Sequence, residues 1–170
     1  MRAGASFLLV LIFAAFTHAQ ENYRVGITCQ KKRLEVERIR GDTKRKVEEK
    51  WGYAITIANQ SFKDVPDVQV DYIIFYKTAI PGRVENATRD KRSSGTKPVG
   101  LLKNNTSFVC ETDPIDLTTT QLNANRYYVT GAKAIAKDVI TGVKVRVKSG
   151  DHVIGEFADP PGLKSSEKWN

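Results

Sequence analysis

The chain has 170 residues and a formal net charge of +8, from 27 lysines and arginines against 19 aspartates and glutamates. Without a leader, about 150 residues remain, which is enough for one compact domain and excludes a second one of ordinary size. The positive charge favours anionic partners such as acidic polysaccharide, lipid headgroups or nucleic acid, although a solvated basic surface is the simpler interpretation.

The N-terminal segment predicts export. Residues 1–19 contain an early arginine, an apolar run from Phe7 to Phe16, and small residues just before Gln20. This is the pattern of a secretory signal peptide, and the apolar run is too short to span a bilayer comfortably. We therefore expect a secreted or periplasmic protein whose mature chain begins near Gln20 and has no transmembrane segment.

The first part of the mature chain is rich in charge. Strands are predicted at Tyr23–Thr28 and Lys31–Arg40, with a turn near Gly41. Between Lys31 and Lys50, nine basic residues stand against five acidic ones. A solvated outer face with cross-strand ion pairs is the simpler interpretation, and a ribbon that binds anions is the alternative.

The stretch from Trp51 to Lys77 carries the clearest strand pattern. Aromatic and β-branched residues alternate from Trp51 to Ile57, which predicts a strand with one face in the core and Trp51 as a large buried anchor. A second strand is predicted from Val68 to Tyr76, covered on both sides near its end because the opposite face is also apolar there.

A polar connection is predicted between Ile80 and Gly95. It has little to bury, and loops commonly carry binding sites. The alternative is a variable spacer without function. The candidate contact loop contains four cations: Arg83, Arg89, Lys91 and Arg92.

The C-terminal half returns to strand patterns. A hairpin is predicted across Val99–Cys110, whereas Thr118–Ala136 has no clear period. Valines at 143, 145 and 147 alternate with basic residues, so a closing hairpin with one solvent-facing side is predicted up to Phe157. Together the patterns give seven to nine short strands and an antiparallel sandwich spanning residues 20–162, followed by a short tail at 163–170.

Two runs resemble a known family. ITIANQSFKDVPDVQVDYIIFYK, starting at Ile55, and PVGLLKNNTSFVCETDPIDL, starting at Pro98, are similar to FxLYD-type and related immunoglobulin-like domains of exported bacterial proteins. The resemblance implies a single all-β immunoglobulin/fibronectin-III-like sandwich. It also implies use in protein or envelope contacts, with no catalytic residues to carry over.

Cys29 and Cys110 are the only cysteines. An even count in an exported chain favours a disulfide between them. The bond would close a loop of about 80 residues and stabilise the fold by roughly 4.5 kcal/mol in the chain-entropy model. The alternative is a pair of unbonded buried thiols.

The inventory of catalytic groups is small. Beyond the leader, His152 is the one histidine, and no His/Cys cluster has metal-ligand spacing, so we expect neither a metal nor a cofactor. The sequence therefore predicts a noncatalytic interaction or structural module whose partner is a protein or an anionic envelope polymer, without specific nucleic-acid binding. A hydrolase that acts on envelope glycans through paired carboxylates is the alternative.

Overall fold

The computed structural model describes residues 23–83, 87–124, 126–163 and 168–169. The predicted leader, residues 1–19, lies outside the described residues. Regular structure in the described part consists of strands throughout, which confirms the all-β prediction: β1 Val25–Arg40, β2 Lys44–Asn59, β3 Val65–Ala79, β4 Thr88–Leu102, β5 Ser107–Glu111, β6 Ile115–Leu122, β7 Ile135–Lys137, β8 Val139–Ser149 and β9 His152–Asp159.

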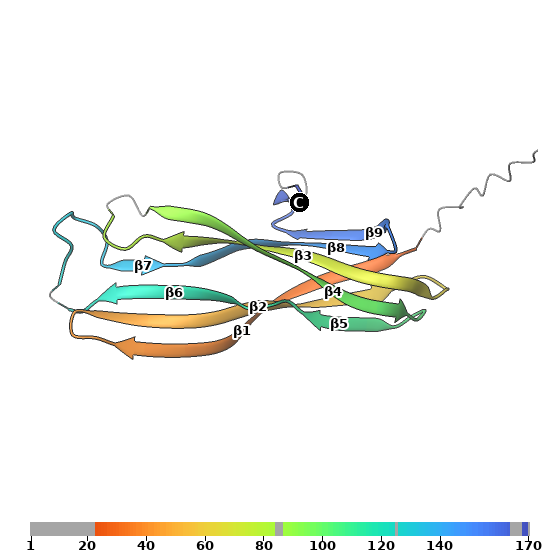
Figure 1. Cartoon of the computed structure of the whole chain (residues 1–170), viewed down its shortest axis with the longest axis horizontal. Coiled ribbons are helices and arrows are strands. Elements are labelled where there is room, and N and C mark those ends of the chain that lie inside the picture. Colours follow the sequence, from red (N-terminus) through yellow and green to blue (C-terminus); the bar gives the residue numbers. More distant parts are fainter. Residues whose placement is uncertain (1–22, 84–86, 125, 164–167, 170) are drawn as a thin grey trace, which may run out of the picture.

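The strands form two antiparallel sheets packed as a sandwich (Figure 1). In the first sheet β2 pairs with β1 on one side and with β5 and β6 on the other, and β7 follows β6. The second sheet has the order β4-β3-β8-β9. Two antiparallel sheets of several strands that pack face to face over a shared core are the architecture of immunoglobulin-like domains. The predicted immunoglobulin/fibronectin-III-like sandwich is therefore confirmed.

The core lies between the two sheets at one end of these long strands. Tyr53, Ile55 and Ile57 of β2 are buried as the alternation predicts, and they face a second set of buried side chains from the other sheet. That set comprises Val68, Val70, Tyr72, Ile74, Val143, Val145 and Val147. The prediction for Trp51 is wrong: its side chain is only partly buried, because it lies at the margin of this core.

β5 and β6 follow one another along the same side of β2, and an extra residue interrupts the strand pairing between them. Ala54 pairs with Glu111 and Trp51 with Ile115, so three residues between β5 and β6 stand opposite two of β2, as in a β-bulge. The bulge is fixed from the other sheet by Tyr72. Its hydroxyl donates to a carboxylate oxygen of Asp113 and accepts from the backbone N–H of Asp113, each at 2.8 Å.

β1 and β2 extend well beyond the core. Each has 16 residues, or about 50 Å at the rise of an extended strand. Only the part of β2 from Tyr53 onward lines the core. We call the remaining portion of the first sheet the arm; it consists of Arg33–Arg40, Lys44–Trp51, β6 and β7.

The chain passes from one sheet to the other at Asp138. Its carboxylate accepts a hydrogen bond from the backbone N–H of Ala79 in β3 and another from that of Thr118 in β6, both at 2.8 Å. Its own backbone N–H donates to the carbonyl of Thr118 at 2.9 Å. One side chain thus joins both sheets where β7 ends and β8 begins.

Trp169, near the C-terminus, lies against the outer face of the second sheet. The indole ring of Trp169 lies 4.3 Å from the guanidinium of Arg146 and 5.0 Å from the ammonium of Lys144. The predicted double coverage of β3 is confirmed, since Ile73 and Phe75 are buried on this outer face. The prediction that the basic side of β8 faces solvent is wrong for Lys144, which is 2% exposed.

Candidate anion-binding face

The arm has two faces with different charge. Side chains alternate along each strand, and cross-strand partners share a face, so the registers assign every residue. The Trp51 face carries five cations and one carboxylate: Arg33, Arg38, Arg40, Arg45, Lys137 and Glu49. Lys31 continues it toward the core on β1. The Lys50 face carries three cations and four carboxylates: Lys44, Lys46, Lys50, Glu35, Glu37, Glu48 and Asp116.

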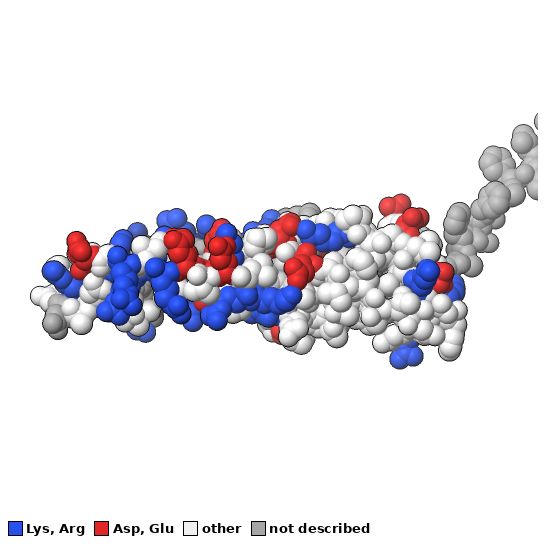
Figure 2. Space-filling view, turned by 90° about the horizontal axis from the view of Figure 1, so that it is seen from below, with Lys and Arg blue, Asp and Glu red and all other residues white. Residues whose placement is uncertain are grey.

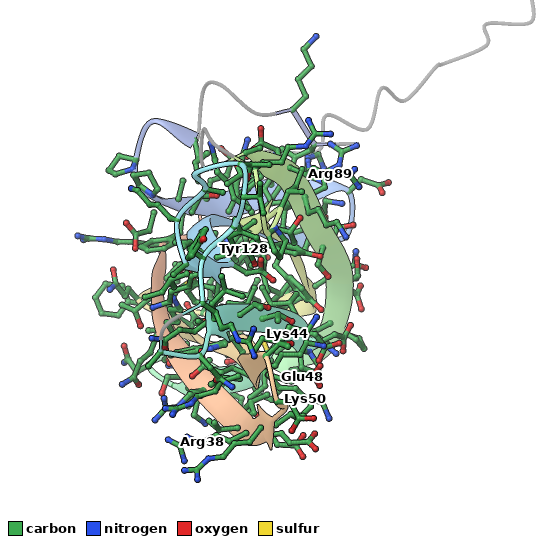
Figure 3. All side chains as sticks on the ribbon, turned by 90° about the vertical axis from the view of Figure 1, so that its left-hand side faces the viewer. Arg38, Lys44, Glu48, Lys50, Arg89 and Tyr128 are labelled. Carbon is green, nitrogen blue, oxygen red and sulfur yellow. The ribbon has the colours of Figure 1, made fainter. Side chains whose placement is uncertain are left out.

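On the face shown in Figure 2, charged side chains crowd the half that contains the arm, whereas the other half is largely uncharged. Seen from the end of the arm, Lys44, Glu48 and Lys50 lie on one side of the β1–β2 ribbon and Arg38 lies on the other (Figure 3). The two faces are thus directed away from each other.

The Lys50 face is neutralised by ion pairs. Lys50 bonds Glu35 at 2.6 Å, and Lys46 pairs with Glu48. The hydrogen bond to Glu35 raises the pKa of Lys50, which holds the ammonium charged. A depression of about 330 Å³ on this face is lined mostly by acidic residues of the same face: Glu35, Glu37, Glu48 and Asp116. This face matches the simpler interpretation of the charged stretch.

The distal part of the Trp51 face is different. Arg38, Arg40 and Arg45 are exposed, and none of them forms an ion pair among the described residues. They line a cleft of about 300 Å³ together with the hydroxyl-bearing Thr119 and the amide-bearing Gln121, and no carboxylate lines it.

Arg40 and Arg45 are direct cross-strand partners. Side chains in such positions have Cβ atoms about 5 Å apart, and like charges placed there destabilise the sheet. The fold does not require two arginines at these positions, because the hydrogen bonds that pair β1 with β2 are made by the backbone. An anion bound between the two guanidinium groups would relieve the repulsion and accept bidentate hydrogen bonds.

The proximal end of the Trp51 face is a mixed cluster. The Lys31 ammonium lies 4.6 Å from the Trp51 ring centre and the Arg33 guanidinium 5.8 Å from it. Glu49 accepts from Arg33 and from the indole N–H, both at 3.2 Å. Burial, with a further contribution from the charge of Lys137, lowers the pKa of Lys31. The one carboxylate of this face is therefore already engaged.

The segment of the predicted contact loop is mostly a strand, so the prediction of a loop conformation is wrong, whereas its contact with a partner stays a prediction. Arg89, Lys91 and Arg92 lie in β4, where Arg89 and Lys91 share one side and Arg92 the other. Pairing with β3 holds this segment as a strand, although its polar composition did not predict one. Arg83 remains in a turn, beside Lys133 and Lys137 around a cleft of about 270 Å³. Residues 84–86 lie outside the described part.

The predicted disulfide is also wrong, since both cysteines are free. Cys29 and Cys110 pair with the same residue, Ile55, from opposite sides of β2. Two strand spacings put their Cα atoms about 10 Å apart, which exceeds the range that a disulfide can bridge. Burial raises the pKa of Cys110 and, with smaller contributions from neighbouring charges, that of Cys29 to about 12. These thiols are packing groups of the core margin.

A separate polar cluster stabilises the second sheet. One carboxylate oxygen of Asp71 accepts from Arg146 at 2.9 Å and Lys148 at 2.6 Å, and the other accepts from Gln69 at 3.0 Å and Thr96 at 2.9 Å. Burial acts to raise the pKa of Asp71, but these four donors outweigh it and hold the pKa well below its usual value. The cluster is satisfied internally, which identifies it as structural.

No cluster of three or more potential metal ligands occurs among the described residues. In the same part of the chain, no helix has the length and apolar character needed to cross a membrane.

No protein-family model matches the chain, and the search of curated proteins found no match. Solved structures that resemble it include the structural-genomics target SoR45, at 13% identity and a TM-score of 0.33, with 86% of this chain and 94% of that one covered. The putative ApaA protein of Bordetella pertussis matches at 11% identity and 0.34, covering 81% and 94%. A protein from Akkermansia muciniphila matches at 9% and 0.28, covering 86% and 73%. TM-scores this low carry no argument about fold or function.

Proposed function

We propose that this protein is a noncatalytic, exported binding module that engages an anionic partner through the Trp51 face of the arm. The observation that carries the proposal is the uncompensated group of Arg38, Arg40 and Arg45 around one cleft. Planar guanidinium groups bind sulfate, phosphate and carboxylate by paired hydrogen bonds, and Thr119 and Gln121 offer neutral partners beside them.

The arm holds this face on long paired strands that extend beyond the core. A binding surface built on paired strands is held more rigidly than one on a loop, because each strand fixes its neighbour. The opposite Lys50 face is close to neutral, so an anionic partner is directed to one side. The predicted export fits a partner in the cell envelope or the extracellular space.

Binding to dextran sulfate, with neutral dextran as the blank, tests the proposal. The variant Arg38→Gln/Arg40→Gln/Arg45→Gln should bind about tenfold more weakly or worse, and wild-type affinity should fall as salt rises. The matched control is Arg89→Gln/Lys91→Gln/Arg92→Gln, which removes the same charge from β4. An equal loss in both variants would mean that net charge, and not this face, governs binding.

A carboxylate hydrolase is the second candidate, because Glu37 stands directly opposite Glu48 in the acidic depression of the Lys50 face. A glycosidase needs one carboxyl kept neutral in apolar surroundings. Here the surroundings are ionic instead of apolar, because Glu48 pairs with Lys46 and Glu35 pairs with Lys50. Release of reducing ends from an envelope glycan by the wild type, lost in Glu48→Gln, would overturn the noncatalytic proposal.

A further inference from the structure

The distal end of the molecule is a tip made from three connections. They are the β1–β2 turn at residues 41–43, the β3–β4 turn around Gly82, and the β6–β7 loop at residues 123–134. Asn123 fastens the loop to the first turn: its backbone N–H donates to Thr43 at 3.1 Å, and its side-chain amide donates to two carbonyls of the same turn, at 2.9 and 3.0 Å.

The same loop is fastened to the β3–β4 turn. Thr130 donates from its hydroxyl to the carbonyl of Gly82 at 2.9 Å. The ring of Tyr128 lies against Gly82, 3.3 Å from the position a Cβ would take, and Gly82 has a φ of +80°. Any other residue at this position would be strained and would push the ring away. Tyr128 is visible between the strands in the view onto the tip (Figure 3).

Because Tyr128 is turned inward, its two neighbours are turned outward. Tyr127 is 83% exposed and Val129 is 98% exposed. Because the backbone of this loop is already anchored, a contact through these two side chains costs less conformational entropy than it would on an unanchored loop.

Cations lie on the same connections as the two apolar residues. Arg126 and Lys133 belong to the same loop, Arg83 lies beside Lys133, and Arg40 and Arg45 end the basic face of the arm next to the first turn. Asp42 is the carboxylate that the described part of the three connections contributes. The described part of the tip thus combines two exposed apolar side chains with an excess of positive charge.

We propose that this tip inserts Tyr127 and Val129 into the interface of an anionic phospholipid bilayer, while the Trp51 face of the arm engages the headgroups. The inference rests on the proposed function for its electrostatic part. Tyrosine is suited to the headgroup level, where the ring is apolar and the hydroxyl is wet. Basic residues near an anionic bilayer add attraction that falls off within a Debye length.

A protein partner fits this surface less well. A standard protein interface buries about 800 Å² on each side around a central apolar cluster. The loop exposes two large apolar side chains, which is too few for such a cluster, whereas a bilayer interface accepts them without needing a matching pocket.

Co-sedimentation with vesicles tests the inference. The wild type should bind vesicles of equal phosphatidylcholine and phosphatidylglycerol, and not vesicles of phosphatidylcholine alone. Tyr127→Ser/Val129→Ser should weaken vesicle binding about tenfold and leave dextran sulfate binding unchanged, since no charge is altered. The matched control is Phe62→Ser/Val153→Ser, which removes an exposed aromatic residue and an exposed valine near the opposite end of the long strands.

The outcomes separate the two proposals. Retained dextran sulfate binding without vesicle binding, or a tip variant that sediments like the wild type, would overturn the bilayer inference and leave the proposed function intact. Vesicle binding that depends on Tyr127 and Val129 but not on Arg38, Arg40 and Arg45 would overturn the proposed role of the basic face instead.

Discussion

Asp71→Asn should destabilise the protein strongly. The two carboxylate oxygens divide their partners, one accepting from the cations Arg146 and Lys148 and the other from Gln69 and Thr96. An asparagine has one acceptor oxygen and one NH₂ donor group. If the oxygen accepts from one pair of partners, the NH₂ group must face the other pair, which are donors too. Because Asp71 is only 8% exposed, water cannot replace every hydrogen bond that the substitution removes.

The size of the effect follows from these contacts. Hydrogen bonds to charged groups contribute about 1.5–3 kcal/mol each, and breaking a buried ion pair costs about 3–5 kcal/mol. Arg146 and Lys148 retain some exposure and can be partly rehydrated, so we expect a loss of about 3 kcal/mol at pH 7. Because the folded-state pKa of Asp71 is depressed, its stabilisation is present above the unfolded value of 3.8 and is lost as pH falls through the folded-state pKa.

Urea unfolding of the wild type and Asp71→Asn from pH 7 down to pH 2.5 would measure this. The difference in free energy of unfolding should be greatest near neutral pH and narrow below pH 3.8. Asp90→Asn is the matched control, because Asp90 forms an exposed ion pair with Lys77 at 3.4 Å and should contribute less than about 0.5 kcal/mol. A constant difference across the whole pH range would refute the assignment of the effect to the Asp71 charge.

Three other predictions concern the core, the thiols and the basic face. Gly95→Ala should cost about 2–3 kcal/mol in urea melts, because the new Cβ would lie 2.6 Å from the Tyr72 ring; an effect near zero would mean that the ring moves freely. Cys29, with a pKa of about 12, should react with a thiol reagent at pH 8 about a thousandfold more slowly in the native state than when unfolded, whereas fast native labelling would contradict its burial. Arg45→Gln should raise stability by about 0.5 kcal/mol at low salt while weakening dextran sulfate binding, and a loss of stability would count against repulsion between Arg40 and Arg45.

The fold could be predicted wherever one face of a strand was uniformly apolar. The alternation through Tyr53, Ile55 and Ile57 placed β2 correctly, because burial of one face leaves a period-2 pattern in the sequence. β4 could not be found in this way. From Thr88 to Lys97 it has no apolar side chain, and this part is ordered by hydrogen bonds to β3, which leave no pattern in the side chains.

The disulfide prediction failed for a related reason. Residue counts and the predicted compartment favour a bond, but they do not say how many strands lie between two cysteines. With β2 inserted between Cys29 and Cys110, the distance is set by sheet order, which was not part of the sequence argument.

Part of the basic face could have been read from the sequence. Continuing the alternation of β2 backward from Trp51 places Arg45 on the same face. The face on which Arg38 and Arg40 lie could not be obtained from the alternation of β1, because an irregularity at Leu34 shifts the register between Arg33 and Glu35. That single extra residue decides that Arg38 and Arg40 join Arg45 instead of facing the opposite side.

The distribution of charge on the arm is the strongest indication that it has a role beyond stability. The same two strands that place Lys50 against Glu35 place Arg40 against Arg45, so ion pairs form along the Lys50 face, whereas the distal part of the Trp51 face sets cation against cation. A face shaped by stability alone would alternate the signs of opposed charges. The arm also extends beyond the core that would justify its length in burial. Both features are expected if the Trp51 face meets a ligand that supplies the missing negative charge.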